Sequence, residues 1–164
     1  MPRMWAGRRW ILTEAEGRGV RIALLVARFN NMITEQLLVG ARDRLIAKGV
    51  PEDGITVLRV PGAWELPQAA RNVVNSGRFD AIVAIGCVIR GETPHFDYVA
   101  GNASEGLGQG ALTADIPIGF GVLTTDDAEQ AMSRCDLYGA NRGSEYAEAA
   151  LAMIEFQQTL DNPA

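Results

Sequence analysis

The sequence contains one histidine, His95, and imidazole is the side chain that exchanges protons most readily near neutral pH. Lys48 is likewise the only lysine, and Cys87 and Cys135 are the only cysteines. These counts exclude a zinc site with two histidines and any C-x-x-C motif. If the protein carries out proton chemistry near pH 7, His95 is the obvious candidate, but a histidine at a helix start can also be an ordinary solvated surface residue.

The residues just before His95 suggest a phosphate site. Gly91-Glu92-Thr93 precedes Pro94 and a helical pattern, and backbone N–H groups at a helix start can hold a phosphate together with the Thr93 hydroxyl. The same pattern also fits a plain turn with a helix cap. No lysine or arginine lies between Arg90 and Arg134. Arg134 could bind the phosphate or stabilise the C-terminus of its own helix.

Other candidates also allow two interpretations. Phe29 could cap the core or offer a flat face to a heterocycle, and Glu65 could bind a ligand or be an ordinary first-turn helix acid. A Cys87–His95 nucleophile pair is not favoured, because no third residue is indicated to orient it. The glycines between 106 and 110 lie inside a helical pattern, so they favour close helix packing or subunit contact over dinucleotide binding.

The elements that must position these residues follow an alternating pattern. Short Val- and Ile-rich runs predict strands at residues 22–27, 55–60, 81–88 and 116–123, buried on both faces. Helical patterns lie between and after them, at about 33–47, 64–76, 95–113, from 126, and at about 144–160. In the last of these, we expect Tyr146, Ala150, Met153, Ile154 and Gln157 to share one face. The order predicts an α/β fold, a three-layer flavodoxin-like sandwich around a four-stranded parallel sheet.

Ligands of open parallel sheets bind beyond the carboxyl ends of the strands. The loops after the four predicted strands should therefore converge at one edge of the sheet. They carry most of the candidates: Arg28-Phe29-Asn30, Pro61-Gly62-Ala63-Trp64-Glu65, Gly86 to His95, and Thr124-Thr125.

Length and charge restrict the remaining possibilities. The 164 residues predict one domain, residues 20–164, after an N-terminal arm, residues 1–19, that has room for an extra edge strand at 9–13. The net charge of −5 argues against nucleic acid or an anionic membrane as partner. No apolar stretch reaches the length of a membrane span or a signal peptide, and the cysteines show no pairing pattern, so we expect a cytoplasmic protein.

Taken together, the loop sequences closely resemble the lumazine synthase family from about residue 21 to residue 160. The most specific block is Gly86-Cys87-Val88-Ile89-Arg90-Gly91-Glu92-Thr93-Pro94-His95-Phe96-Asp97-Tyr98-Val99. Supporting motifs are Arg28-Phe29-Asn30, Pro61-Gly62-Ala63-Trp64-Glu65-Leu66-Pro67, Phe120-Gly121-Val122-Leu123-Thr124-Thr125, Glu129-Gln130-Ala131…Arg134 and Asn141-Arg142-Gly143…Glu145.

The resemblance implies an enzyme and a reaction. It would condense 5-amino-6-(D-ribitylamino)uracil with 3,4-dihydroxy-2-butanone 4-phosphate to 6,7-dimethyl-8-ribityllumazine, releasing phosphate and water, in the penultimate step of riboflavin biosynthesis. Neither a metal nor an organic cofactor would be needed. Family members form pentamers, some of which assemble further into sixty-subunit shells, with active sites at subunit interfaces.

The resemblance also implies roles for individual residues. His95 would be the acid/base, contributing modestly rather than absolutely. The pyrimidine ring and ribityl chain would be bound by Phe29, Ala63, Trp64, Glu65, Cys87, Val88, Ile89 and, from the adjacent subunit, Phe120. The phosphate would be held by Glu92, Thr93 and Arg134, with Gly91, Arg142 and Glu145 as further site candidates.

The chain departs from the family pattern between residues 135 and 142. Relatives often have a Gly- and Lys-containing loop there, and Arg142 stands where a lysine is usual. Two alternatives to the enzyme are a related flavin-binding or shell protein and a generic flavodoxin-like FMN or phosphoryl-signalling domain. The complete set of Phe29, Thr93, His95 and Arg134 argues against the first, because a pure binder does not need a site for leaving phosphate. The Arg28-Phe29-Asn30 loop argues against the second, since it provides neither an acidic pocket nor phosphate-loop glycines.

Overall fold

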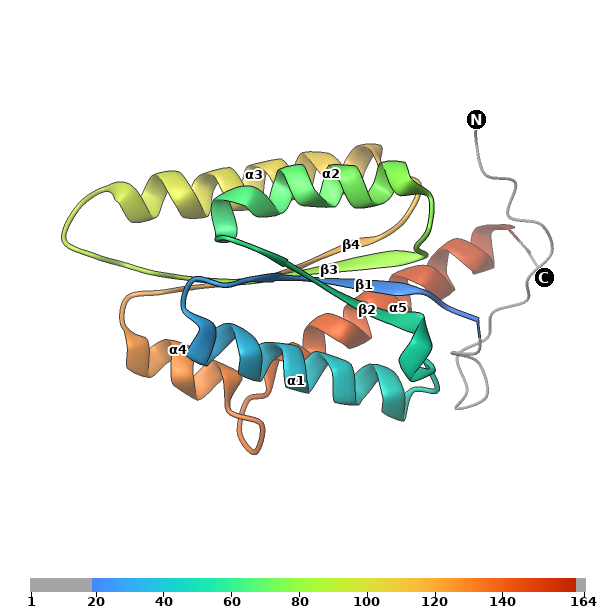
Figure 1. Ribbon diagram of the computed structural model, residues 1–164, viewed down its shortest axis with the longest axis horizontal. Helices are drawn as coiled ribbons and strands as arrows, with labels where there is room; N and C mark the ends of the chain where they lie inside the picture. The colour runs from blue at the N-terminus through green and yellow to red at the C-terminus, as the bar shows by residue number, and fades with distance from the viewer. Residues whose placement is uncertain (1–18, 162–164) are drawn as a thin grey trace.

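The computed structural model describes residues 19–161, which fold as an α/β sandwich. All four strands are parallel and lie in the order β2-β1-β3-β4. Helices α2 and α3 cover one face of the sheet and α1, α4 and α5 cover the other (Figure 1). The elements are β1 (Ile22–Ala27), α1 (Asn31–Ala47), η1 (Glu52–Gly54), β2 (Ile55–Val60), η2 (Ala63–Glu65), α2 (Leu66–Ser76), β3 (Ala81–Ile89), α3 (His95–Thr113), β4 (Ile118–Thr125), α4 (Ala128–Cys135) and α5 (Arg142–Asp161). The predicted fold class is confirmed, and the possible edge strand at residues 9–13 lies outside the described residues.

The two central strands explain the continuous apolar runs in the sequence. Successive side chains of a strand point to opposite faces, so Ile22, Leu24 and Val26 pack under α1 and α5 while Ala23 and Leu25 pack under α2 and α3. β3 is divided between the same two cores. Because both faces of β1 and β3 are covered, every position of β1 and nearly every position of β3 is buried.

The edge strands do not follow the prediction. β2 is half-buried or exposed along its whole length, so the expected burial of 55–60 on both faces is wrong. The described residues place no strand along the outer side of β2, and Thr56 and Arg59 lie within it. The run at 116–123 is displaced, because β4 begins after Pro117, which has no N–H to pair, and continues to Thr125.

The start of α4 is set by its capping residues. Asp127 accepts a hydrogen bond from the backbone N–H of Gln130, and the Gln130 side chain accepts one from the N–H of Asp126. This reciprocal cap confirms that the two acids begin a helix. The segment predicted as a helix from 64 is instead the short turn η2 followed by α2, with Pro67 in the first turn.

Glycines allow two helix pairs to pack closely. A Cβ on Gly143 of α5 would collide with the backbone oxygen of Leu37 in α1. A Cβ on Gly106 of α3 would lie 2.7 Å from Pro67 of α2, which confirms helix packing at that glycine. The predicted Tyr146–Gln157 face of α5 is confirmed in part: Ala150 and Ile154 are buried and Tyr146 packs half-buried against the same core, whereas Met153 and Gln157 are exposed. The buried residues of α5 are Gly143, Ala147, Ala150, Leu151, Ile154 and Gln158.

No helix within residues 19–161 combines the length and the apolar character needed to cross a bilayer. Over the same range, no three His, Cys, Asp or Glu side chains gather as a metal ion would require.

Candidate active site

Hydrogen bonds join the loops that follow β1, β2 and β3. The N–H of Arg28 donates to the oxygen of Val60 over 2.8 Å, and the N–H of Phe29 donates to the oxygen of Pro61 over 3.0 Å. On the other side, Asn30 Nδ2 donates to the oxygen of Cys87 over 2.8 Å. The loop that carries Phe29 is therefore fixed between its two neighbours at the carboxyl edge of the sheet.

Phe29 presents its ring to solvent. The side chain is 71% exposed, so it does not cap the core. A Cβ built on Gly62 would lie 3.9 Å from Phe29 Cβ and 3.4 Å from Glu65 Oε2, which shows that the aromatic and the carboxylate flank this glycine. The two groups form one surface with a flat apolar face and an acceptor.

The η2 turn is held from both sides. Ala63 is buried and lies 3.5 Å from the position a Cβ would take on Gly86, so the glycine lets η2 approach β3. Asn102 Nδ2 in α3 donates to the oxygen of Trp64 over 3.0 Å. The Trp64 side chain is left about half exposed.

The end of β3 contributes backbone rather than reactive side chains. Cys87 and Val88 are buried on opposite faces of the sheet, and Ile89 is half-buried. Burial raises the pKa of the Cys87 thiol to about 11, and Cys135 adds to the shift. At neutral pH Cys87 is a thiol, not a thiolate, which supports setting aside a cysteine nucleophile.

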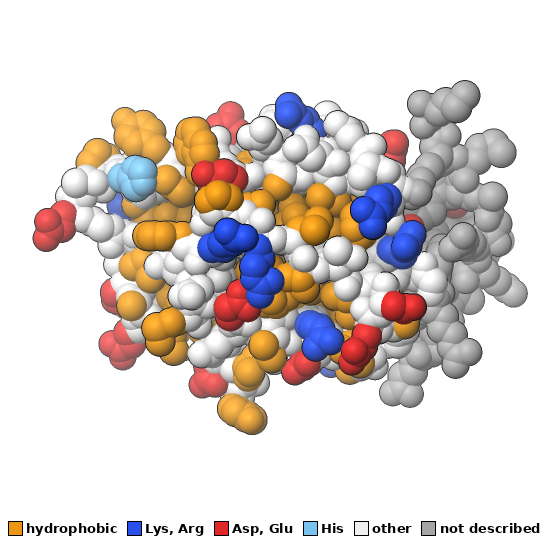
Figure 2. All heavy atoms as spheres, in the orientation of Figure 1, with side chains coloured by type: hydrophobic (Ala, Val, Ile, Leu, Met, Phe, Trp, Pro, Cys, Tyr) orange, Lys and Arg blue, Asp and Glu red, His pale blue; other side chains and the backbone are white. Residues whose placement is uncertain are grey.

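The loop from Gly91 to His95 is exposed throughout. Thr93 Oγ1 accepts a hydrogen bond of 3.4 Å from the N–H of His95, and the first turn of α3 closes with Asp97 N–H on the oxygen of Pro94. No described residue hydrogen-bonds to the His95 ring, which is exposed. Figure 2 shows exposed apolar side chains around the histidine at this end of the molecule.

Four predicted site residues lie outside the loops that follow β1, β2 and β3: Phe120, Arg134, Arg142 and Glu145. Phe120 pairs with Ala84, five residues before Ile89, which places it about 17 Å from the end of β3 along the strand. Arg134 lies in the last turn of α4, about 9 Å along the helix axis from its first residue. We call these four residues the β4-flank group and the remaining predicted site residues the strand-end group.

Within the β4-flank group, both basic residues already have protein partners. Arg134 Nη1 donates to the oxygen of Gln130 over 3.0 Å, so part of its guanidinium caps its own helix. The structure gives its other N–H groups no partner among the described residues, and they are available to an anion. Arg142 Nη1 pairs with Glu145 Oε2 within the first turn of α5.

Several residues that shape the site were not predicted as part of it. Asn30 ends the Arg28-Phe29-Asn30 motif, and Arg90 lies in the motif from Gly86 to Val99. Their places in these motifs could have identified them as site residues. Asn102 contacts Trp64 across 38 positions of sequence, and no local pattern could have indicated it.

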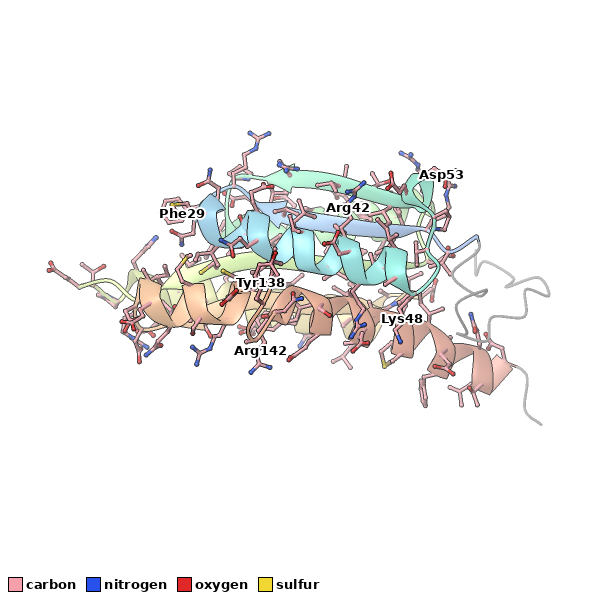
Figure 3. The ribbon with its side chains drawn as sticks, turned by 90° about the horizontal axis from the view of Figure 1, so that it is seen from below. Phe29, Arg42, Lys48, Asp53, Tyr138 and Arg142 are labelled. Atoms are coloured by element: carbon pink, nitrogen blue, oxygen red, sulfur yellow. The ribbon has the colours of Figure 1, made fainter. Side chains whose placement is uncertain are left out.

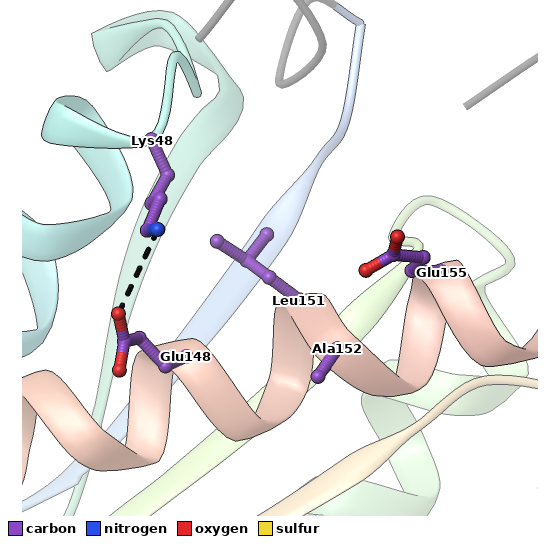
Figure 4. Close-up of a pocket in the computed structure, with 5 residues that line it drawn as sticks. All are labelled: Lys48, Glu148, Leu151, Ala152 and Glu155. Carbon is purple, nitrogen blue, oxygen red and sulfur yellow. Dashed lines mark ion pairs between the residues drawn. The ribbon is translucent and has the colours of Figure 1, made fainter. Parts of the chain in front are cut away.

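A groove lies away from these loops, lined by Lys48, Glu148, Leu151, Ala152 and Glu155 (Figure 4). Lys48 Nζ lies 3.8 Å from Glu148 Oε1 across it. Figure 3 shows Phe29 and Lys48 at opposite ends of α1, so the groove is no part of the strand-end group.

The fold and the strand-end group define a flavodoxin-like α/β protein whose candidate site lies at the carboxyl edge of its sheet. Residues 19–158 match the family model described as 6,7-dimethyl-8-ribityllumazine synthase. The chain belongs to this enzyme family, and the resemblance inferred from the loops is confirmed.

Proposed function

We propose that the protein condenses 5-amino-6-(D-ribitylamino)uracil with 3,4-dihydroxy-2-butanone 4-phosphate to form 6,7-dimethyl-8-ribityllumazine, phosphate and water. The observation that carries this proposal is the Asn30–Cys87 hydrogen bond, which holds the exposed Phe29 beside the end of β3. Family membership supports it, since the family is named for forming this lumazine.

The pyrimidine substrate fits the surface between the first three strands. The exposed ring of Phe29 stacks on the heterocycle, and backbone groups of Cys87, Val88 and Ile89 bind its polar edge. The ribityl hydroxyls reach η2, where Glu65 Oε2 accepts hydrogen bonds beside Gly62 and the backbone of Ala63 and Trp64 contributes further ones. Binding in this way would hold the reacting amine in place next to the loop after β3.

The phosphate of the second substrate lies on the loop after β3. Backbone N–H groups from Gly91 to Thr93 and the exposed Thr93 hydroxyl bind its oxygens at the start of α3, with Glu92 in the same loop. Arg134 supplies the positive charge that stabilises phosphate as it leaves.

His95 moves protons during the reaction. The substrate amine adds to the butanone carbonyl, water leaves to give an imine, phosphate is expelled, and the second ring closes with loss of water. Each step gains or loses a proton, and the free imidazole of His95 stands directly after the phosphate loop. Both substrates are intrinsically reactive, so orientation supplies much of the rate and His95 a modest part.

Two copies of the chain complete one site in this proposal. Phe120 lies about 17 Å from the end of β3 along the strand, so the β4-flank group of one subunit serves the strand-end group of the next. We propose a closed homo-oligomer, a pentamer or an assembly of pentamers. We further propose that residues 20–164 form the catalytic domain behind the arm and that the protein works in the cytoplasm, where the free thiols of Cys87 and Cys135 would persist.

The test mixes the purified protein with both substrates and follows lumazine absorbance and phosphate release together. We expect both signals to rise well above the rate in buffer and in equal amounts. Binding of the pyrimidine substrate without acceleration would favour a lumazine-binding or shell protein, and would overturn the enzyme.

A further inference from the structure

Arg90 is the residue immediately before the exposed Gly91–His95 loop. Its backbone N–H donates to the oxygen of Thr125 over 2.9 Å, so the ends of β3 and β4 are joined at this point. The mechanism above gives Arg90 no role.

The Arg90 side chain contacts both elements that border the loop. Its Nη1 lies 3.5 Å from Asp97 Oδ1, and its guanidinium carbon lies 4.3 Å from the centre of the Phe96 ring, both in the first turn of α3. Its Nε lies 3.3 Å from Asp126 Oδ1, in the turn that leads into α4. One guanidinium therefore connects the start of α3 to the start of α4 across the base of the loop.

These contacts hold the adjoining loop in place and contribute little to the free energy of unfolding of the whole domain. Arg90, Asp97 and Asp126 are about half exposed or more, and exposed ion pairs contribute little to folding because water and salt screen them. Gly91, Glu92 and Thr93 are themselves exposed, so little packing holds the loop. The arrangement also depends on the planar, forked shape of arginine, because one group must stack on a ring and reach two carboxylates.

We propose that Arg90 is a positioning residue that fixes the phosphate-binding loop and the first turn of α3, which carries His95. The inference deepens the proposed function, and it predicts a selective effect on the phosphate substrate. Arg90 supports the loop that binds phosphate, whereas the pyrimidine surface is held by Asn30 and Asn102.

The test compares R90K and R90M with the wild-type oligomer. The measurements are KM for each substrate and the dissociation constant of inorganic phosphate, followed through the amide NMR signals of Gly91 and Thr93. We expect phosphate binding to weaken and KM for the butanone phosphate to rise, each by about tenfold, because small displacements of a binding group are costly. KM for the pyrimidine should change less than about twofold, and the melting temperature should stay the same.

The chain provides a matched control. The Arg78 guanidinium lies 5.6 Å from the centre of the Phe79 ring, just before β3 and at the opposite end of the sheet, so R78M removes a comparable stack outside the site. R78M should leave all three constants unchanged. D97N and D126N should each reproduce part of the R90M effect, whereas R90K should not restore phosphate binding.

Equal changes in both KM values, a lower melting temperature that accounts for the loss, or full rescue by R90K would overturn the positioning role. If the wild-type protein binds phosphate but forms no lumazine, the proposed function fails while the phosphate titration still tests Arg90. A wild-type protein that neither forms lumazine nor binds phosphate would overturn both.

Discussion

Asn30 adopts a left-handed backbone conformation, with φ at 59°, and donates its Nδ2 to the oxygen of Cys87 over 2.8 Å. The left-handed conformation ends the loop after β1 and starts α1. The hydrogen bond joins that loop to β3. Asparagine is one of the few residues that tolerates this backbone conformation while offering a side-chain donor. The exposed Phe29 thus rests on a fixed loop.

Replacing Asn30 separates these two properties. N30G keeps the backbone conformation and loses the hydrogen bond, whereas N30A loses the bond and also strains the backbone. We expect both variants to unfold more easily, N30G by about 1 kcal/mol and N30A by about 2 kcal/mol, measured in urea. KM for the pyrimidine should rise in both. Equal stability of the two variants would show that the left-handed conformation costs nothing.

Removing the imidazole should slow the reaction without ending it. We expect H95A and H95Q to lower kcat by about ten- to a hundredfold, at or below the low end of acid–base catalysis, while both substrates bind as before. Steady-state kinetics on the purified protein measures this. Complete loss of activity with intact binding of both substrates would contradict the modest role assigned to His95.

Mixing two damaged variants tests whether neighbouring subunits share a site. F29A disables the strand-end group and R134A disables the β4-flank group. If each site combines the two groups from different copies, co-refolded one-to-one mixtures should regain about a quarter of the wild-type activity through sites with two intact halves. Each variant refolded alone is the control. If the mixture shows only the average activity of the two variants, both groups of a site come from the same chain.

Alanine at two helical glycines should have opposite effects. G143A places a methyl group against the Leu37 backbone oxygen, so we expect a loss of about 3 kcal/mol from the close packing of α1 on α5. G108A has open space around it and should stabilise α3 by about 0.5 to 1 kcal/mol. Urea unfolding of both variants measures the difference, and a stable G143A would contradict the close approach.

The buried thiol predicts an alkaline loss of stability. The pKa of Cys87 is about 11 in the folded protein against 9 when exposed, because burial disfavours the thiolate. Below pH 9 both states hold the proton, but between pH 9 and 11 the unfolded chain loses it first, so unfolding becomes easier. We expect this group to cost on the order of 1 to 2 kcal/mol by pH 11. Between pH 8 and pH 10.5 the free energy of unfolding should fall less for C87A than for the wild-type protein. Equal falls for the two proteins would refute this prediction.

The sequence alone determined the order of the elements and the loops that carry chemistry. The apolar runs of β1 and β3 are continuous because both faces of a central parallel strand are covered, and that pattern is local. The motif from Gly86 to His95 is likewise contiguous. These features needed no knowledge of which segments meet in space, and for the same reason the family could be inferred from them.

The tertiary structure decided what local patterns cannot encode. The exposure of β2 follows from its place at the sheet edge, and the buried line of α5 follows from the approach of Gly143 to Leu37. The separation of Phe120 from the strand ends follows from the pairing of β4 with β3. Strand order, register and helix rotation depend on contacts between residues far apart in sequence, so only the folded chain fixes them.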